Sequence, residues 1–260
     1  MQISITLEQM EQGPLILVNR QCPIQNPKPP FPLATMPSSY GFIQLAQIAQ
    51  TKLLACLQTL QAEADIIPIS GYRSLAEQQQ IYEDSLQEHG LAFTQKFVAL
   101  PNTSEHQTGL AIDLALQQAE IDFICPEFPY HGICQAFREV APSFGFIERY
   151  AKGKETITGI AQEPWHFRYV GTPHAKIITQ YGFCLEEYHQ FLQQFPVDGE
   201  HFYWQQKETE AEIFLISKEK MVSTGNYLLE LPEQTSIHCS GNNHNAVIIT
   251  LERRQNHAKF

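Results

Sequence analysis

Two short segments of the sequence, about fifty residues apart, contain the residue types of a hydrolytic metal site. The first, SEHQTGLAID, runs from Ser104 to Asp113, and the second, EPWHFRYVG, runs from Glu163 to Gly171. Three histidine or carboxylate ligands can hold Zn2+ while one coordination position stays open for water, and a further carboxylate can take the proton of that water. Together the two segments predict a zinc peptidase.

Strand alternation indicates how the first segment could build such a site. Residues two apart along a strand share a face, so in LAIDLAL the side chain of Asp113 emerges beside the small residues Ala111 and Ala115. His106 precedes Asp113 by an odd number of positions, and a continuous strand would put the two on opposite faces. Gly109 lets the chain turn before the strand begins. We therefore expect His106 and Asp113 to meet.

The second segment is typical of a strand that begins at Pro164, because proline cannot donate a hydrogen bond to a sheet and is tolerated at a strand's start. Glu163 would then belong to the preceding loop, free of strand alternation. It could point towards a metal-bound water beside His166.

Each segment alone is more often structural than catalytic, since single histidines beside aromatic strands are common. Their combination favours a site. The sequence contains no HExxH motif, which excludes a thermolysin-like site. A cysteine or serine hydrolase is the weakest alternative, because no cysteine lies beside a histidine in a motif.

The motifs SxHxxGxAxD and ExWHxRY, with an upstream SGYRS from Ser70 to Ser74, resemble those of the zinc D,D-peptidases of the VanX, VanY and VanXY type, which act on D-Ala-D-Ala ends of cell-wall precursors. The likeness extends from about Leu15 to Phe195 and is strongest to the bifunctional VanXY branch. It implies hydrolysis of D-Ala-D-Ala as a free dipeptide, at the end of a muramyl pentapeptide, or both. It also implies a role in glycopeptide (vancomycin) resistance.

The resemblance further implies roles for individual residues. The Zn2+ ligands would be His106, Asp113 and His166. Glu163 would act as general base and acid, and Arg73 would stabilise the developing oxyanion. Candidates for holding the substrate or forming the pocket walls are Ser104, Gln78, Tyr150 and Trp165. The two aromatic residues among them could equally be core side chains.

Two alternatives stay open on the same scaffold. One is a general wall-recycling L,D- or D,D-carboxypeptidase. The other is a catalytically silent zinc-containing binding module, as in the related Hedgehog signalling domain. Glu163 discriminates between an enzyme and a silent module, and its presence favours the enzyme.

Composition narrows the partners and the location. The net charge of -11 argues against nucleic acid as the main partner, and a small peptide substrate is compatible with it. No apolar stretch is long enough for a membrane span, and the N-terminus lacks a signal-peptide pattern. The six cysteines form no CxxC pair and lie mostly in apolar stretches, which is typical of buried thiols. We therefore expect a cytoplasmic protein.

Helical and strand patterns do not alternate strictly, which predicts an α+β fold with a mixed or antiparallel sheet flanked by helices. The resemblance implies the Hedgehog/D-Ala-D-Ala peptidase type of this fold. We expect a catalytic domain over residues 1–196. Residues 197–260 contain the short apolar runs AEIFLIS, NYLLELP and AVIITLER, which predict a small β-rich appendage.

Two elements should position the upstream SGYRS motif. Residues 66–69 predict a short strand, in which Pro68 indicates an edge position or a bulge. Ser74 and Glu77 form a capping box that should open a helix ending at Gly90. Arg73 would lie directly before that helix.

A further helix is expected from Ser38 or Ser39 to about Ala62. Its apolar stripe begins with Phe42 and continues to Leu60, and such a stripe usually packs into a core.

Overall fold

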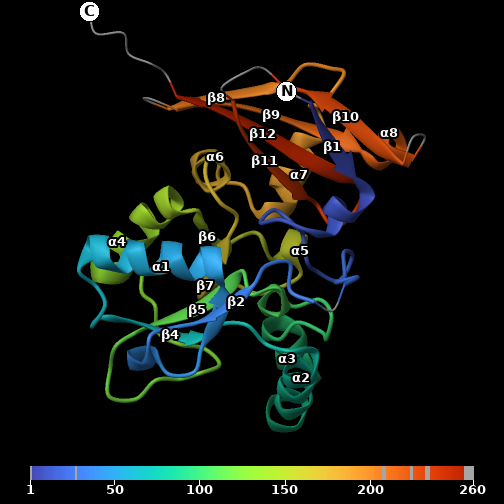
Figure 1. Cartoon of the computed structure of the whole chain (residues 1–260). Helices are drawn as coiled ribbons and strands as arrows, with labels where there is room; N and C mark the ends of the chain where they lie inside the picture. Colours follow the sequence, from blue (N-terminus) through green and yellow to red (C-terminus); the bar gives the residue numbers. More distant parts are fainter. Residues whose placement is uncertain (1, 27, 207–208, 223–224, 232–234, 255–260) are drawn as a thin grey trace, which may run out of the picture. The chain divides into compact units, whose positions relative to one another are not determined.

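The computed structural model describes residues 2–26, 28–206, 209–222, 225–231 and 235–254 (Figure 1). Its contacts divide the chain into a central unit, residues 18–186, and a terminal unit, residues 1–17 together with 187–260.

This division differs from the boundary expected between residues 196 and 197, which assigned the N-terminus to the catalytic domain. In the structure, β1 (Gln2–Thr6) pairs antiparallel with β10 (Asn226–Glu230). A strand must pair its backbone groups with another strand, and β1 finds its partner near the C-terminus. Residues 1–17 therefore belong with the C-terminal strands.

The central unit contains a four-stranded antiparallel sheet of order β4-β5-β7-β6, which confirms the expected α+β class. Its strands are β4 (Ile66–Ser70), β5 (Ala111–Leu116), β6 (Phe146–Tyr150) and β7 (Glu163–Tyr169). Strand β4 lies at an edge and its register shifts between Pro68 and Ser70, as the proline indicated. Strand β5 is interior and buried along most of its length, which explains its apolar character on both faces.

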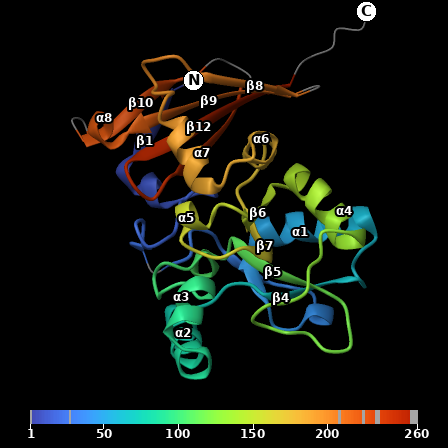
Figure 2. The same cartoon turned by 180° about the vertical axis from the view of Figure 1, so that it is seen from behind.

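Two pairs of helices accompany this sheet. Both views show α1 (Gln47–Leu60) beside α4 (Gly132–Val140), and α2 (Leu75–His89) beside α3 (Leu91–Phe97) (Figures 1 and 2). The buried face of α1 consists of Ala49, Leu53, Cys56 and Leu57. Their spacing of three to four residues is that of one helical face.

The expected start of the first helix is wrong. Residues Ser38–Tyr40 form only the 3-10 turn η2, and Gln44–Ala46 form strand β3, which pairs with β2 (Leu33–Thr35). Phe42 lies between them and is fully exposed, although the stripe had placed it in a core. Pairing with β2 overrides the helical pattern of this segment, because the backbone groups of β3 are satisfied in the small sheet.

The remaining helices are short. In the part of the chain that the structure describes they are η1 (Leu7–Glu11), η3 (Glu105–Thr108), η4 (Ala141–Phe144), α5 (Glu155–Thr158), α6 (His174–Tyr181), α7 (Leu185–Leu192) and α8 (Lys218–Val222).

The terminal unit is β-rich, as its apolar runs predicted. A four-stranded antiparallel sheet has the order β11-β12-β9-β8. Its strands are β8 (Phe202–Gln206), β9 (Thr209–Ser217), β11 (Ser236–Gly241) and β12 (Ala246–Arg254). An apolar cluster packs between this sheet's residues and the β1–β10 pair, and it includes Ile5, Phe214, Ile216, Val247 and Ile249.

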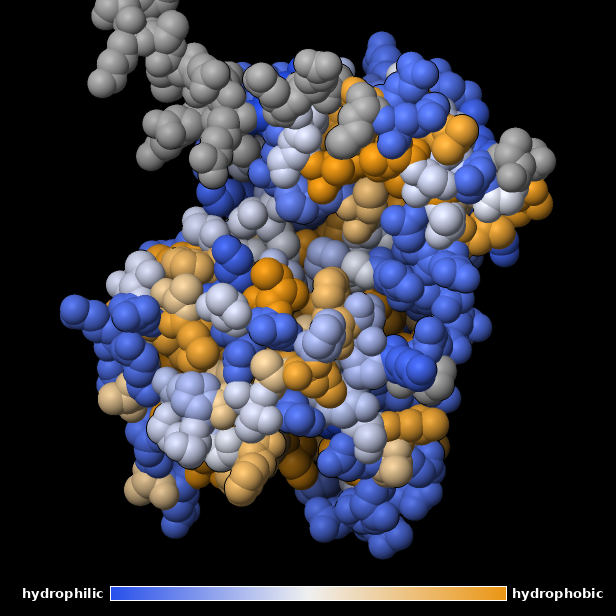
Figure 3. Space-filling view, viewed as in Figure 1, coloured by the Kyte–Doolittle hydropathy of each residue, from blue (hydrophilic) through white to orange (hydrophobic). Residues whose placement is uncertain are grey.

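Figure 3 shows polar and apolar side chains interspersed over the visible face of the central unit. Large apolar side chains of the central unit that reach solvent, such as Leu91 and Tyr130, are ordinary for a globular surface. None of the helices in the described ranges combines the length and the hydropathy that crossing a bilayer requires.

Candidate active site

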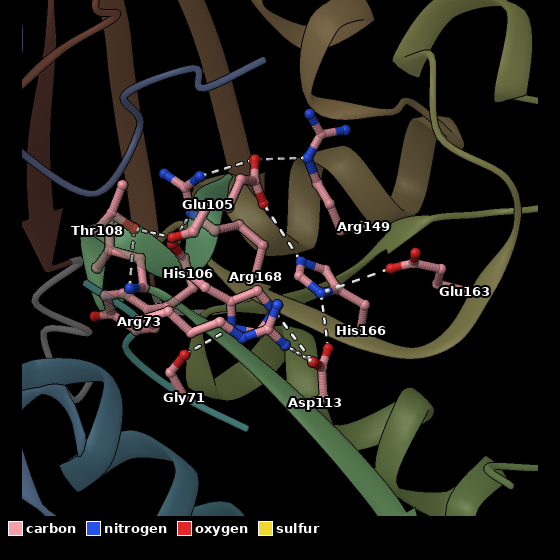
Figure 4. Close-up of polar contacts among 12 residues, drawn as sticks. Gly71, Arg73, Glu105, His106, Thr108, Asp113, Arg149, Glu163, His166 and Arg168 are labelled. Carbon is pink, nitrogen blue, oxygen red and sulfur yellow. Dashed lines mark hydrogen bonds and ion pairs between the residues drawn. The ribbon is translucent and has the colours of Figure 1, made fainter. Parts of the chain in front are cut away.

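Residues His106, Asp113 and His166 come together from three elements of the central unit (Figure 4). The register of β5 and β7 sets Asp113 directly opposite His166, and His106 projects from the short helix η3. One ligand atom of each side chain lies within 4.8 Å of the other two. All three side chains are buried. The two sequence motifs therefore converge on one cluster.

Hydrogen bonds orient the imidazole rings of this cluster. Nδ1 of His106 lies 2.7 Å from the carbonyl oxygen of Gly71. A carbonyl oxygen only accepts, so Nδ1 donates and Nε2 keeps its lone pair, 3.1 Å from Oδ2 of Asp113. His166 presents its Nδ1 instead, 2.8 Å from Oδ1 of Asp113. Two imidazole nitrogens and a carboxylate oxygen are a donor set that suits Zn2+.

The turn at Gly109 is what lets His106 reach Asp113, as the sequence indicated. Gly109 has a φ of 71°, in the left-handed region, and it ends helix η3. A side chain there would also be too close to its surroundings, because a Cβ would lie 2.7 Å from the Leu33 side chain and 3.0 Å from the Ala46 backbone nitrogen. Only glycine meets both requirements without strain.

Glu163 is the first residue of β7, so the expectation that it belongs to the preceding loop is wrong. Tyr150 pairs with Glu163 and Glu148 pairs with Phe167, so two steps along β6 match four steps along β7. The extra residues form an irregularity that breaks the two-residue alternation of the strand. As a result Oε2 of Glu163 lies 3.8 Å from Nδ1 of His166.

Arg73 reaches the same cluster from the segment between β4 and α2. Its Nη2 donates to Oδ2 of Asp113 at 2.9 Å, and its Nε donates to Oγ of Ser70 at 2.9 Å. The register shift at the end of β4 precedes this segment, and helix α2 begins after it with the predicted capping box of Ser74 and Glu77. Arg73 is thus held between two well-defined elements.

These side chains line a pocket of about 430 Å3. The four residues proposed to touch substrate all line it too, namely Gln78, Ser104, Tyr150 and Trp165. Gln78 is almost fully buried, and its amide donates to the carbonyl oxygen of Ala99 at 2.9 Å. The ring of Tyr150 lies over that of His166, with centroids 4.9 Å apart. Apolar side chains such as Phe97 and Phe123 also line the pocket.

Comparison with known proteins agrees with the family resemblance found in the sequence motifs. The family model described as VanY, D-alanyl-D-alanine carboxypeptidase, matches residues 43–172, which contain every residue of the cluster. The bifunctional D-Ala-D-Ala dipeptidase and D-Ala-D-Ala carboxypeptidase VanXYC of Enterococcus gallinarum is 42% identical over 181 residues, which are 69% of this chain and 95% of that protein. The chain belongs to the VanY family of D-alanyl-D-alanine peptidases.

Solved structures of the VanY family agree with this membership. The vancomycin resistance D,D-dipeptidase VanXYg, in complex with a D-Ala-D-Ala phosphinate analog, has a TM-score of 0.91 and 42% identity, over 97% of this chain and 99% of that chain. A mutant of the D,D-pentapeptidase VanY from a VanB-type resistance cassette, in complex with Zn(II), has a TM-score of 0.56 and 33% identity. That match covers 68% of this chain and 98% of that one.

Burial and nearby charges strongly shift the pKa values of residues in the site of this VanY-family chain. Burial, aided by Arg73, lowers the pKa of His106 to about 4, so the ring is neutral, as a metal ligand must be. Burial raises the pKa of Glu163 to about 8, with further contributions from Asp113 and Glu105, while His166 and Arg73 oppose them. A divalent cation at the ligands would favour the ionised carboxylate, which a general base requires.

A group of buried charges next to these ligands was not predicted from the sequence. Glu105 contacts Arg149 and Arg168, and Arg149 also contacts Glu186. Burial tends to raise the pKa of Glu105, but the two arginines hold it well below its ordinary value. A signal was present, because FIERY and WHFRYV place an arginine among the aromatic and aliphatic residues of a strand, and a buried arginine needs an acidic partner.

Proposed function

We propose that the protein is a zinc-dependent D,D-peptidase that hydrolyses D-Ala-D-Ala, both as the free dipeptide and at the C-terminus of muramyl pentapeptide precursors. Destroying this terminus removes the ligand of glycopeptide antibiotics, so the activity would contribute to vancomycin resistance. The cytoplasmic location expected from the sequence stays a prediction.

One observation carries the proposal: His106, Asp113 and His166 meet Glu163 and Arg73 at one pocket. Identity of 42% over nearly the whole length of a bifunctional dipeptidase and carboxypeptidase supports both activities. A structural match at a TM-score of 0.91 to an enzyme in complex with a D-Ala-D-Ala phosphinate analog supports the dipeptide as substrate.

The donor set fits zinc. The tautomer of His106 is fixed by Gly71, so its Nε2 is available, and Nδ1 of His166 lies on the other side of the Asp113 carboxylate. We propose that these two nitrogens and an oxygen of Asp113 hold the ion. A bound Zn2+ would supply a Lewis acid that polarises a carbonyl group and acidifies a water molecule.

Glu163 would transfer the proton, and Arg73 would stabilise the negative charge that develops on the substrate. Oε2 of Glu163 is within 4 Å of Nδ1 of His166, so it can take a proton from a water that enters beside the ligands. The same carboxyl group can then pass the proton to the amine of the leaving D-alanine. Arg73 would donate to the scissile carbonyl oxygen as it becomes negative, which stabilises the transition state more than the substrate.

The remaining pocket residues would hold the peptide. Ser104 and Gln78 offer polar groups, and Tyr150 and Trp165 offer aromatic walls. Gln78 also accepts a long hydrogen bond, 3.5 Å, from Nη1 of Arg73. Part of its contribution is therefore to orient the guanidinium.

The test is the release of D-alanine by the purified, zinc-loaded protein from D-Ala-D-Ala and from UDP-muramyl pentapeptide, assayed side by side. The Glu163→Gln variant is the control for contaminating peptidases. Release from both substrates is the expected result, and release from one would restrict the protein to dipeptidase or to carboxypeptidase action.

Two further outcomes would overturn the proposal. Release of D-alanine only from a tetrapeptide with an L,D-linkage would assign the protein to wall recycling. Zinc binding without hydrolysis of any of these peptides would indicate a silent binding module.

A further inference from the structure

A fully buried carboxylate lies directly behind one of the proposed metal ligands. Both arginines hold the same oxygen of Glu105, because Nε of Arg149 lies 2.8 Å and Nη1 of Arg168 lies 2.9 Å from Oε1. Arg149 is held in turn by the two oxygens of Glu186, at 2.8 and 2.6 Å. Buried ion pairs contribute little net stability, because desolvation offsets their attraction. Stability alone is therefore a weak reason for this arrangement.

The second oxygen of the same carboxylate is placed differently. Oε2 of Glu105 makes no hydrogen bond to any described residue, and neither does Nε2 of His166. The two atoms are buried and face each other at 3.7 Å (Figure 4). This separation is slightly too long for a hydrogen bond, and a small rotation of the ring would close it. Buried polar atoms usually have hydrogen-bond partners, so two neighbouring buried atoms without one indicate a functional role.

We propose that Glu105 is a positioning residue, which accepts the Nε2 proton of His166 and so keeps the lone pair of Nδ1 free for the metal position. This inference rests on the proposed function, because it gives Glu105 a role in the proposed zinc site. The two arginines hold the carboxylate by its other oxygen, which restrains Oε2 beside the ring. His106 obtains the corresponding support from the Gly71 carbonyl.

The carboxylate differs from that carbonyl in carrying a charge. Two acidic and two arginine side chains make up the group, so its formal charges cancel. Glu105 can therefore orient His166 while the group as a whole adds no net charge behind the metal position. A charged acceptor also makes the ring a stronger ligand than a neutral one does.

The substitution Glu105→Gln tests this sharply. Arginine has only donors, so the amide oxygen must take the place of Oε1 beside Arg149 and Arg168. The amide NH2 would then face Nε2 of His166 and favour the opposite tautomer, with the proton on Nδ1. We expect the affinity for Zn2+ to fall by roughly 10- to 100-fold.

Glu186→Gln is the matched control. It removes the same charge from the same group and perturbs Arg149, but it changes no atom that faces His166. A merely structural or charge-balancing role would lower zinc affinity equally in both variants. The proposal predicts a large loss in Glu105→Gln and little change in Glu186→Gln.

Two readouts apply without any peptide substrate. The first is the zinc dissociation constant, from competition with a chromophoric chelator. The second is nitrogen-15 NMR of histidine-labelled, zinc-loaded protein, in which we expect His166 to carry its proton on Nε2 in the wild type and in Glu186→Gln. Thermal unfolding of both variants checks that they fold.

Several results would overturn the inference. Unchanged zinc affinity and an unchanged His166 tautomer in Glu105→Gln would do so, and so would an equal loss in Glu186→Gln. If Glu105→Gln does not fold, the wild-type spectrum still decides, because a proton on Nδ1 of His166 contradicts the proposal. If Glu105→Gln changes zinc affinity and the His166 tautomer as expected but the wild type releases no D-alanine, the proposed substrate is wrong. The role of Glu105 is then still supported.

Discussion

The two units of the chain bury different kinds of side chain. The central unit encloses Glu105, Asp113, Glu163, Arg149 and Arg168, together with two histidine ligands. Among the described residues of the terminal unit, no buried side chain is an aspartate, glutamate, lysine or arginine, and its core cluster is apolar.

This difference separates the part of the chain built for stability from the part built for chemistry. Burying an apolar side chain stabilises a fold, whereas burying a charge is costly unless it is paired. The central unit pairs its charges closely, yet it leaves Glu163 in a site where burial opposes ionisation. A poorly satisfied group at a pocket is characteristic of an active site.

If the division of roles is correct, the largest loss of turnover should come from a metal ligand. His106→Ala removes one of three donors, and we expect zinc affinity to fall by more than the roughly 100-fold that loss of an outer-shell partner can cause. Metal content after dialysis and D-alanine release measure this. The exposed His131→Ala is the control, and equal zinc content in both variants would refute the ligand assignment.

Loss of the proposed base should leave zinc in place. Glu163→Gln keeps the size of the side chain but cannot accept a proton, so we expect kcat to fall by roughly 10²- to 10⁴-fold with unchanged metal content. The exposed Glu155→Gln serves as the matched variant. Activity retained by Glu163→Gln would exclude Glu163 from the base role.

Arg73→Lys should have the next largest effect. A lysine ammonium cannot hold Ser70 and Asp113 in the fixed geometry of the guanidinium while also meeting the substrate. We expect kcat/KM to fall by about 10²- to 10³-fold, the usual cost of losing an oxyanion donor. Steady-state kinetics against the exposed Arg20→Lys provide the comparison, and a loss below about threefold would contradict the assigned role.

A core substitution in the terminal unit should affect stability without affecting chemistry. Phe214 is buried in the apolar cluster, so Phe214→Ala should lower the free energy of unfolding by about 3–5 kcal/mol and leave kcat of the folded protein unchanged. Urea unfolding and kinetics at low temperature measure both. The exposed Tyr203→Ala is the control. A large fall in kcat would show that the terminal unit contributes to catalysis.

The last prediction is a pH dependence of stability after the metal is removed with a chelator. The pKa of Glu163 rises from 4.5 to about 8, mainly through burial, so the native protein keeps a proton that the unfolded chain releases. The contribution of Glu163 to stability should therefore fall as pH rises from 4.5 to 8, by up to about 1.4 kcal/mol per pH unit. The Glu163→Gln side chain cannot titrate. The stability of this variant relative to the wild type should therefore increase as pH rises from 4.5 to 8. The measurement is urea unfolding of both proteins at several pH values. The same change of unfolding free energy with pH in both proteins would contradict the prediction.

Much of the site could be predicted because its signals are local. The capping box of Ser74 and Glu77, the end of α2 at Gly90 and the turn at Gly109 each depend on neighbours a few residues away. The residue types of the ligands are likewise set by the chemistry of zinc, which accepts few side chains.

Other features escaped prediction because they depend on distant partners. Glu163 faces the ligands through an irregular register between β6 and β7, and Phe42 is exposed because β3 pairs with β2. The N-terminal strand joins the C-terminal strands through β10. None of these pairings has a counterpart in local periodicity.

The sequence by itself determined which residues can bind a metal, which can move a proton, and where the turns that separate them lie, because backbone conformation and ligand chemistry are properties of single residues and short motifs. Only the tertiary structure decided that Glu163 meets His166 through an irregular strand pairing and that Glu105 lies behind the same ring. Both depend on the pairing of strands and the burial of charges brought together from far along the chain.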